Sequence, residues 1–129
     1  MNQSIRRPYF SNILLKNMLK IGVLGGGSWA TALIKIITEN KSKVGWYIRK
    51  DINVEFIKKN HHNPNYISST SLNTKRINIS SNINQVIVDA DILIIAIPSA
   101  FISSEFAKID TSLNEKIIFT AVKLSLIHI

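Results

Sequence analysis

The sequence predicts an α/β fold in which a doubly wound parallel sheet is covered by helices and is incomplete at its C-terminal end. From residue 20 onward, short apolar runs alternate with segments of helical periodicity. This rhythm is typical of parallel strands joined by right-handed crossovers. The first apolar run ends in three consecutive glycines, and the segment 91–97 is continuously apolar after its first residue. Such a run is expected for a strand that is covered on both faces.

The first half of the chain contains two expected strand–helix units. Residues 20–24 form a short apolar run and are expected to be a buried strand. A helix should follow, because apolar residues recur at helical spacing from Ala30 to Ile37. A second strand is expected at 44–48, and Asp51 is expected to be the N-cap of the helix behind it. Residues 60–74 read as a polar loop.

The second half repeats the pattern with shorter elements. We expect a short strand at 77–80, a short helix at 81–90 and the buried strand at 91–97. Pro98 ends that strand, and Ser99 can cap the helix behind it. The last strand is expected at 116–122. A parallel sheet needs helices on both faces, and the helix that would close this one is not in the sequence, so we expect a fragment of a larger protein.

Length and composition limit the function classes. A chain of 129 residues with 46% hydrophobic residues is expected to form one globular domain. No apolar run reaches the roughly 20 residues that span a bilayer, and the chain has no cysteine, which excludes disulfides and thiolate chemistry. The net charge of +8 is spread along the chain, so we expect a phosphorylated small ligand and no nucleic acid. His61 and His62 lack a third ligand nearby, and no metal site is expected.

The two ends of the chain differ from its middle. Residues 1–17 contain three basic and no acidic residues. We expect them to form a disordered basic extension, with a transit peptide as the alternative. Residues 18–123 form the expected domain, and residues 124–129 are an atypical tail.

The glycine-rich turn carries the strongest functional signal. Residues 25–30 fit the dinucleotide-binding pattern Gly-x-Gly-x-x-Gly/Ala. Gly25 would permit the tight turn, Gly27 would let the backbone approach a diphosphate, and Ala30 would let the helix pack closely on the strand. The pattern follows a buried strand and opens an amphipathic helix, which is the context that a Rossmann-type fold requires. No Gly-Lys-Ser/Thr follows, so a mononucleotide P-loop is excluded.

The end of the second strand should select the dinucleotide. An NAD-specific domain usually has Asp or Glu there, to bind the ribose hydroxyls. This chain has Arg49 and Lys50 at that place. A guanidinium can hold the 2′-phosphate of NADP through charge-assisted hydrogen bonds. We therefore expect NADP or NAD, with NADP favoured.

Together, these motifs resemble the N-terminal domain of bacterial NAD(P)-dependent glycerol-3-phosphate dehydrogenase. The resemblance covers residues 20–123 and depends on several motifs in order. They are Gly25–Ala32 with Trp after Ser, the Arg49–Lys50 pair, the loop Asn63–Tyr66, the strand and turn Asp91–Ser99, and the strand end Ala121–Lys123. Several ordered motifs are more specific than the glycines alone.

The resemblance implies a role for each matching residue. Ser28 would lie at the diphosphate, with Trp29 as a wall beside it. Arg49 and Lys50 would hold the adenosine end. The nicotinamide side would be lined by Pro98, Ser99 and Phe101. Lys123 would lie near both the nicotinamide and the phosphate of the substrate.

The resemblance also implies a reaction. It is hydride transfer between NAD(P)H and dihydroxyacetone phosphate, giving sn-glycerol 3-phosphate for glycerophospholipid synthesis in the cytoplasm. The full-length enzyme would be a homodimer. In this family the catalytic lysine lies in a following helical domain, so no catalytic residue is expected in this chain. The family has glycine after its counterpart of Lys123, whereas this chain has Leu124.

Two other functions remain open at this point. One is another NAD(P)-dependent oxidoreductase with a similar first domain, such as a ketopantoate reductase or a nucleotide-sugar dehydrogenase. The other is a dinucleotide-binding module without catalytic activity. The Ser28–Trp29 pair and the strand that ends at Lys123 favour the glycerol-3-phosphate dehydrogenase.

Overall fold

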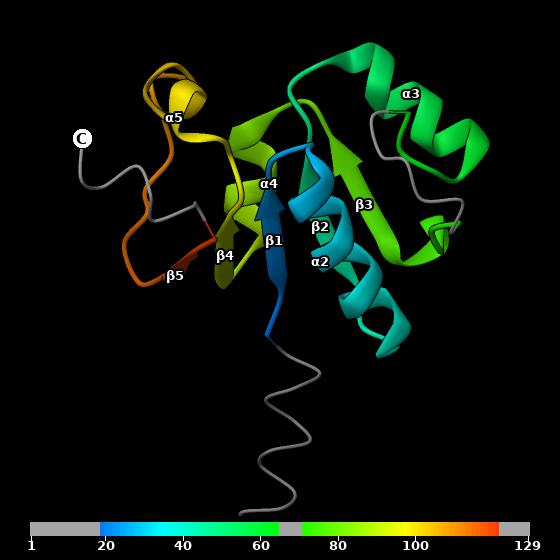
Figure 1. Cartoon of the computed structure of the whole chain (residues 1–129). Helices are drawn as coiled ribbons and strands as arrows, with labels where there is room; N and C mark the ends of the chain where they lie inside the picture. Colours follow the sequence, from blue (N-terminus) through cyan, green and yellow to red (C-terminus); the bar gives the residue numbers. More distant parts are fainter. Residues whose placement is uncertain (1–18, 65–70, 122–129) are drawn as a thin grey trace, which may run out of the picture.

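The computed structural model describes residues 19–64 and 71–121, and these contain one five-stranded parallel sheet (Figure 1). The strand order is β3-β2-β1-β4-β5. The strands are β1 (Ile21–Leu24), β2 (Val44–Tyr47), β3 (Ile77–Ser80), β4 (Ile92–Ile95) and β5 (Ile117–Thr120). The expected N-terminal extension, Lys123 and the tail lie outside the described residues.

The order in which the chain adds strands to the sheet reverses at β1. The chain first adds β2 and β3 on one side of β1, and then returns to add β4 and β5 on the other. Val23 is therefore paired with Trp46 on one side and with Ile94 on the other. In open α/β sheets, ligands bind at the carboxyl ends of the strands beside such a switch point.

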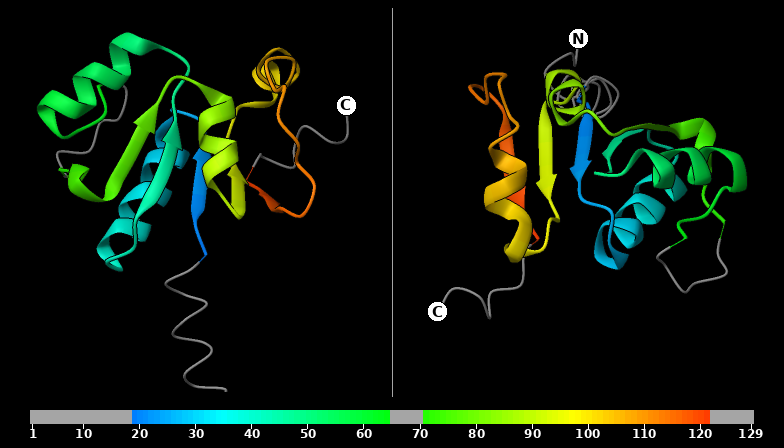
Figure 2. Two further views of the ribbon diagram at one scale, coloured as in Figure 1. Left: turned by 180° about the vertical axis from the view of Figure 1, so that it is seen from behind. Right: turned by 90° about the horizontal axis from the view of Figure 1, so that it is seen from above.

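Helices cover both faces of the sheet, as a doubly wound fold requires. The helices are α2 (Ser28–Glu39), α3 (Asp51–Asn60), α4 (Ile83–Asp89) and α5 (Ser99–Phe106), with a short 3₁₀ helix η1 (Thr74–Arg76) before β3. The views from the front and from behind place α2 and α4 on opposite faces of the sheet (Figures 1 and 2). The predicted fold class is confirmed.

The two faces bury two separate apolar clusters. One joins Ala30 and Ile34 of α2 to Trp46 of β2. The other joins Ile87 of α4 to Tyr47 of β2. Neighbouring residues of β2 thus contribute to opposite clusters, as the alternation of side chains along a strand dictates.

The sheet is covered most thinly at β5. Ile117 and Phe119 are 52% and 57% exposed, although both are large and apolar. The run that forms β4 was expected to be covered on both faces, but only Leu93 of this strand is buried and Ile94 is half-buried. Helices α2 and α3 instead cover the part of the sheet that is formed by β1, β2 and β3 (Figure 1).

Two of the predicted helix caps differ from the structure. Asp51 and Ser99 are the first residues of α3 and α5, and the N-cap positions belong to Lys50 and Pro98 without a side-chain hydrogen bond. The Asp51 carboxylate instead accepts a hydrogen bond from Ser81. Helix α4 is capped by Asn82, whose side chain accepts from the amides that follow it.

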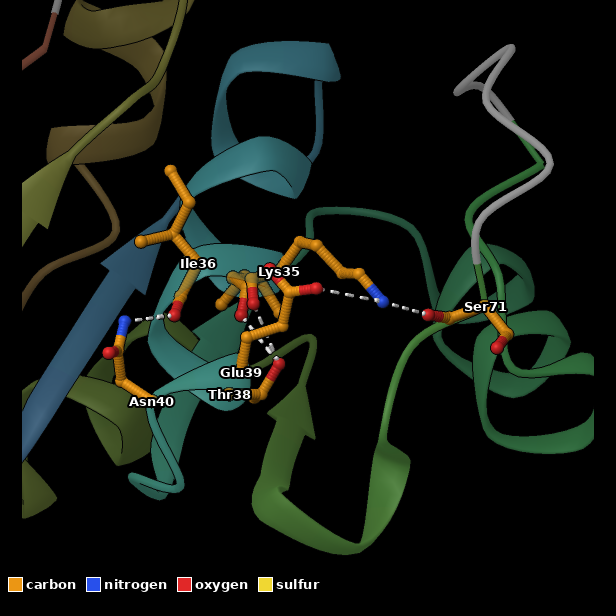
Figure 3. A network of polar contacts seen from close by, with 7 residues as sticks. Lys35, Ile36, Thr38, Glu39, Asn40 and Ser71 are labelled. Atoms are coloured by element: carbon orange, nitrogen blue, oxygen red, sulfur yellow. Dashed lines mark hydrogen bonds and ion pairs between the residues drawn. The ribbon is translucent and has the colours of Figure 1, made fainter.

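The C-terminal half of α2 is anchored to the segment before β3 (Figure 3). The Lys35 ammonium donates a hydrogen bond to the Ser71 carbonyl at 2.9 Å and lies 3.7 Å from the Glu39 carboxylate. The Thr38 hydroxyl donates to the Ile34 carbonyl within the helix. These contacts fix the helix whose N-terminus forms the candidate site.

Candidate functional site

The glycine turn between β1 and α2 lies at the carboxyl end of the sheet. Gly25 has a φ of +133°, a conformation that side chains rarely adopt. A Cβ atom built on Gly25 would lie 2.4 Å from the Ala96 carbonyl oxygen at the end of β4. The turn therefore needs glycine at this position both for its conformation and for its close approach to β4.

Buried side chains hold the carbonyl groups of all three glycines. The Trp46 indole donates to the Gly25 carbonyl at 2.6 Å. The Asn63 amide donates to the Gly26 carbonyl at 2.9 Å, and the Thr31 hydroxyl donates to the Gly27 carbonyl at 2.8 Å. Asn63 also donates to the Thr31 hydroxyl oxygen at 2.8 Å. Side chains from β2, α2 and the loop after α3 thus fix the turn in one conformation.

Replacement of Asn63 by alanine is expected to destabilise the protein. Asn63 is 2% exposed, and its loss leaves the partly buried Gly26 carbonyl and the buried Thr31 hydroxyl without this donor. We expect the free energy of unfolding in urea to fall by about 1–3 kcal/mol.

Asn40→Ala is the matched control, because the exposed Asn40 amide also donates to a backbone carbonyl, that of Ile36. Its loss should cost about 0.5 kcal/mol or less. Equal losses in the two variants would contradict the role given to Asn63.

The N-terminus of α2 is open at Gly27. A Cβ atom built on Gly27 would meet nothing within 4 Å, and no side chain caps the helix there. The first N–H groups of a helix lack acceptors within it and carry the positive end of its dipole. A backbone turn without side chains at the start of a helix is a site that fits a diphosphate.

A groove runs from the glycine turn across the ends of β2 and β4. It is lined by Gly25, Gly26, Gly27, Tyr47, Ile48, Arg49, Lys50, Asn53, Ile97, Pro98, Phe101 and Glu105. Six of the ten residues predicted to contact the cofactor are among them, namely Gly25, Gly27, Arg49, Lys50, Pro98 and Phe101, whereas Ser99 is not. Two others, Ser28 and Trp29, lie exposed on the first turn of α2 outside this lining, and Trp29 is 58% exposed.

Arg49 reaches across the groove toward α5. Its guanidinium carbon lies 5.1 Å from the centre of the Phe101 ring, a distance typical of a cation–π contact. Together with Phe101, the residues Pro98 and Ile97 form an apolar wall of the groove at the end of β4. The groove thus combines basic residues after β2 with an apolar wall after β4.

A buried acid that the sequence did not indicate as functional lies in the same groove. Glu105 of α5 is 4% exposed. One of its oxygens accepts a hydrogen bond from the Tyr47 hydroxyl, and the other accepts one from the Lys108 ammonium at 2.8 Å. The sequence offered only the i, i+3 spacing of Glu105 and Lys108 on a helix, which is common on exposed surfaces.

The hydrogen bonds of this cluster set its charge. Burial raises the pKa of Glu105, but the hydrogen bonds from Lys108 and Tyr47 and the charges of Lys108 and Arg49 outweigh it and hold the pKa below its usual range. Burial, together with the contact to Glu105, raises the pKa of the Tyr47 hydroxyl far above its usual range. At neutral pH the carboxylate is therefore ionised and the phenol is neutral.

The two adjacent histidines contact protein groups. His61 Nδ1 lies 2.8 Å from the Thr74 hydroxyl, and the His62 ring meets the Phe56 ring edge-on. Among residues 19–64 and 71–121, no three His, Cys, Asp or Glu side chains are grouped so that they could hold a metal ion. Within the same residues, no helix has the length and apolar character needed to cross a membrane.

The chain is similar to known proteins over most of its length. A family described as "NAD-dependent glycerol-3-phosphate dehydrogenase N-terminus" matches residues 20–124. "Glycerol-3-phosphate dehydrogenase [NAD(P)+]" of Macrococcus caseolyticus is 36% identical over 105 residues, which are 81% of this chain and 31% of the relative. The chain thus spans about a third of that relative's length.

Two solved structures share the fold of this chain. Glycerol-3-phosphate dehydrogenase of Plasmodium falciparum superposes with a TM-score of 0.72 at 28% identity, over 85% of this chain and 34% of that one. A probable 2-dehydropantoate 2-reductase of Bacillus subtilis superposes with a TM-score of 0.60 at 18% identity, over 85% of this chain and 36% of that one. The second likeness shows a shared fold and nothing more.

Proposed function

Because the chain belongs to the NAD-dependent glycerol-3-phosphate dehydrogenase family, and matches its N-terminal part, we propose that its groove binds NAD or NADP. The observation that carries this proposal is the open N-terminus of α2 at Gly27. It lies at the switch point of the sheet, where α/β folds bind their ligands.

The residues of the groove fit such a ligand. Side chains hold the three glycine carbonyls and so fix the conformation of the turn. In this conformation the backbone amides at the start of α2 would bind the diphosphate. Arg49 and Lys50 suit the adenosine end, and above all a 2′-phosphate. Pro98 and Phe101 supply an apolar wall at the end of β4. Ser28 and Trp29, on the first turn of α2, are proposed to contact the ligand from the helix side.

We further propose that the whole protein interconverts dihydroxyacetone phosphate and sn-glycerol 3-phosphate. The bound dinucleotide would supply or accept the hydride in this reaction. The described residues of this chain would hold and orient it, and none of them is proposed as catalytic. Lys123, outside the described residues, is proposed to bind the phosphate of the substrate as a point charge.

The wider role follows from the same reaction. We propose that the product serves glycerophospholipid synthesis, that the protein works in the cytoplasm, and that the full-length enzyme is a homodimer. Each of these statements depends on the reaction being correct.

Titration of the chain with NADH and with NADPH tests the binding proposal. Energy transfer from tryptophan to the reduced nicotinamide provides the signal, because both Trp29 and Trp46 lie at the glycine turn. We expect saturable binding of at least one of the two cofactors. A chain that unfolds cooperatively but binds neither would contradict the proposal.

Arg49→Ala is expected to weaken the binding of NADPH more than the binding of NADH. The Arg49 guanidinium can form charge-assisted hydrogen bonds with a 2′-phosphate, and NADH lacks this group. We expect the dissociation constant of NADPH to rise about tenfold more than that of NADH.

Arg76→Ala is the matched control, since Arg76 lies on η1 outside the groove. It removes the same charge and should leave the ratio of the two constants unchanged. If Arg49→Ala weakened both cofactors equally, the assignment of Arg49 to the 2′-phosphate would be wrong.

A further inference from the structure

The groove contains one acid among its charged lining residues. These residues are Arg49 and Lys50, which follow β2, and Glu105 of α5. Two bases suit an anionic cofactor, whereas a carboxylate in the same groove opposes it. The presence of Glu105 therefore needs a physical reason.

Glu105 is not free to act as a direct ligand of the cofactor. Its two oxygens already accept hydrogen bonds from Tyr47 and from Lys108, and only 4% of the residue is exposed. These bonds hold the carboxylate in one position and keep it ionised. Glu105 can therefore influence a ligand mainly through its fixed negative charge.

That charge lies close to the group expected to bind the 2′-phosphate. Phe101 and Glu105 are one turn apart on α5, so they lie on the same side of the helix. The Arg49 guanidinium lies over the Phe101 ring, with 5.1 Å between its central carbon and the ring centre. The Arg49 charge also acts on both Glu105 and Tyr47. Arg49 and the fixed negative charge of Glu105 thus line the same groove, both near Phe101.

We propose that Glu105 is a specificity-determining residue, whose buried carboxylate lowers the preference of the groove for NADP over NAD. This inference rests on the proposed dinucleotide binding and on the role of Arg49 in it. A 2′-phosphate adds between one and two negative charges to the ligand. The Glu105 carboxylate repels this added charge and partly neutralises Arg49, whereas the uncharged 2′-hydroxyl of NAD is affected far less.

Two variants of the cluster should shift cofactor preference in opposite directions. Glu105→Gln removes the negative charge and keeps an oxygen that can accept the Tyr47 hydrogen bond. We expect the ratio of the NADH dissociation constant to that of NADPH to rise roughly fivefold. Lys108→Met removes the positive charge that offsets Glu105, and the same ratio should fall by roughly twofold.

Glu55→Gln is the matched control. Glu55 pairs with Lys58 at the same i, i+3 spacing on α3, with 4.0 Å between the charged atoms, and it does not line the groove. The change of net charge is the same as in Glu105→Gln. The ratio of the two dissociation constants should therefore stay at its original value.

The inference is overturned if both variants bind the two cofactors and neither changes the ratio, or if both change it in the same direction. If Glu105→Gln does not fold, the result for Lys108→Met decides alone. The Lys108 side chain is about half exposed, so the fold should tolerate the loss of its ammonium group. Failure of the original chain to bind either cofactor would instead contradict the proposed function. The ratio is measured within each variant, so a general loss of stability does not imitate the effect.

Discussion

Gly25→Ala is expected to lower the free energy of unfolding by more than about 3 kcal/mol. The new methyl group would lie 2.4 Å from the Ala96 carbonyl oxygen, and the backbone at Gly25 would keep a φ of +133° that alanine rarely adopts. Neither conflict can be relieved by rotating a side chain, because both involve backbone atoms. Urea unfolding followed by circular dichroism measures the loss. A small domain has about 5–15 kcal/mol in total, so this loss is a large share of its stability.

Gly45→Ala is the control for this prediction. Gly45 lies in β2, and a Cβ atom there would lie 3.5 Å from the nearest side-chain atom, that of Val86, which is an ordinary contact. We expect a change of about 1 kcal/mol or less. If Gly25→Ala and Gly45→Ala unfolded at the same urea concentration, the turn would not need its observed conformation.

Gly27→Ala, in contrast, is expected to keep the stability of the chain and to lose affinity for NADH. Its Cβ atom would meet no protein atom within 4 Å, and its φ of −82° suits alanine. The cost to stability should be about 1 kcal/mol or less. The methyl group would instead occupy the space through which a diphosphate approaches the amides of α2. Loss of one or two charge-assisted hydrogen bonds should weaken NADH roughly 10- to 100-fold.

Binding and unfolding measured on the same samples separate these two glycines. The unfolding midpoint of Gly27→Ala should stay near that of the unchanged chain while its NADH dissociation constant rises. Unaltered affinity in a folded Gly27→Ala variant would show that the ligand does not approach the turn at this point.

The periodicity of the sequence was sufficient to predict the order and type of the strands and α-helices, but not the 3₁₀ helix η1. The apolar run before three glycines became β1, and the run at 91–97 became β4. The caps were less predictable, because several neighbouring residues can fill such a position. The Asp51 carboxylate accepts a hydrogen bond from Ser81, which lies 30 positions away in the sequence. No local sequence pattern connects the two residues.

The candidate site was predictable only where its chemistry is local. The glycine turn and the basic pair after β2 could be identified from their spacing. The supports of the turn could not, because Trp46 and Asn63 reach it only through tertiary packing. Glu105 was missed for the same reason, because its partner Tyr47 on β2 lies 58 residues away in the sequence. The exposed Trp29 does not line the groove, and its contact with a cofactor stays a prediction.

Residue-resolved mapping of the bound dinucleotide tests the central claim most directly. In a ¹⁵N-labelled chain titrated with NADH, the largest amide shifts are expected at Gly26, Gly27 and Ser28, with smaller shifts at Arg49. A second, basic hollow formed by Lys35, Lys41, Arg76 and their neighbours lies at the other end of α2, and its amides should stay in place. Shifts concentrated at that hollow, with the glycine turn unmoved, would contradict the account.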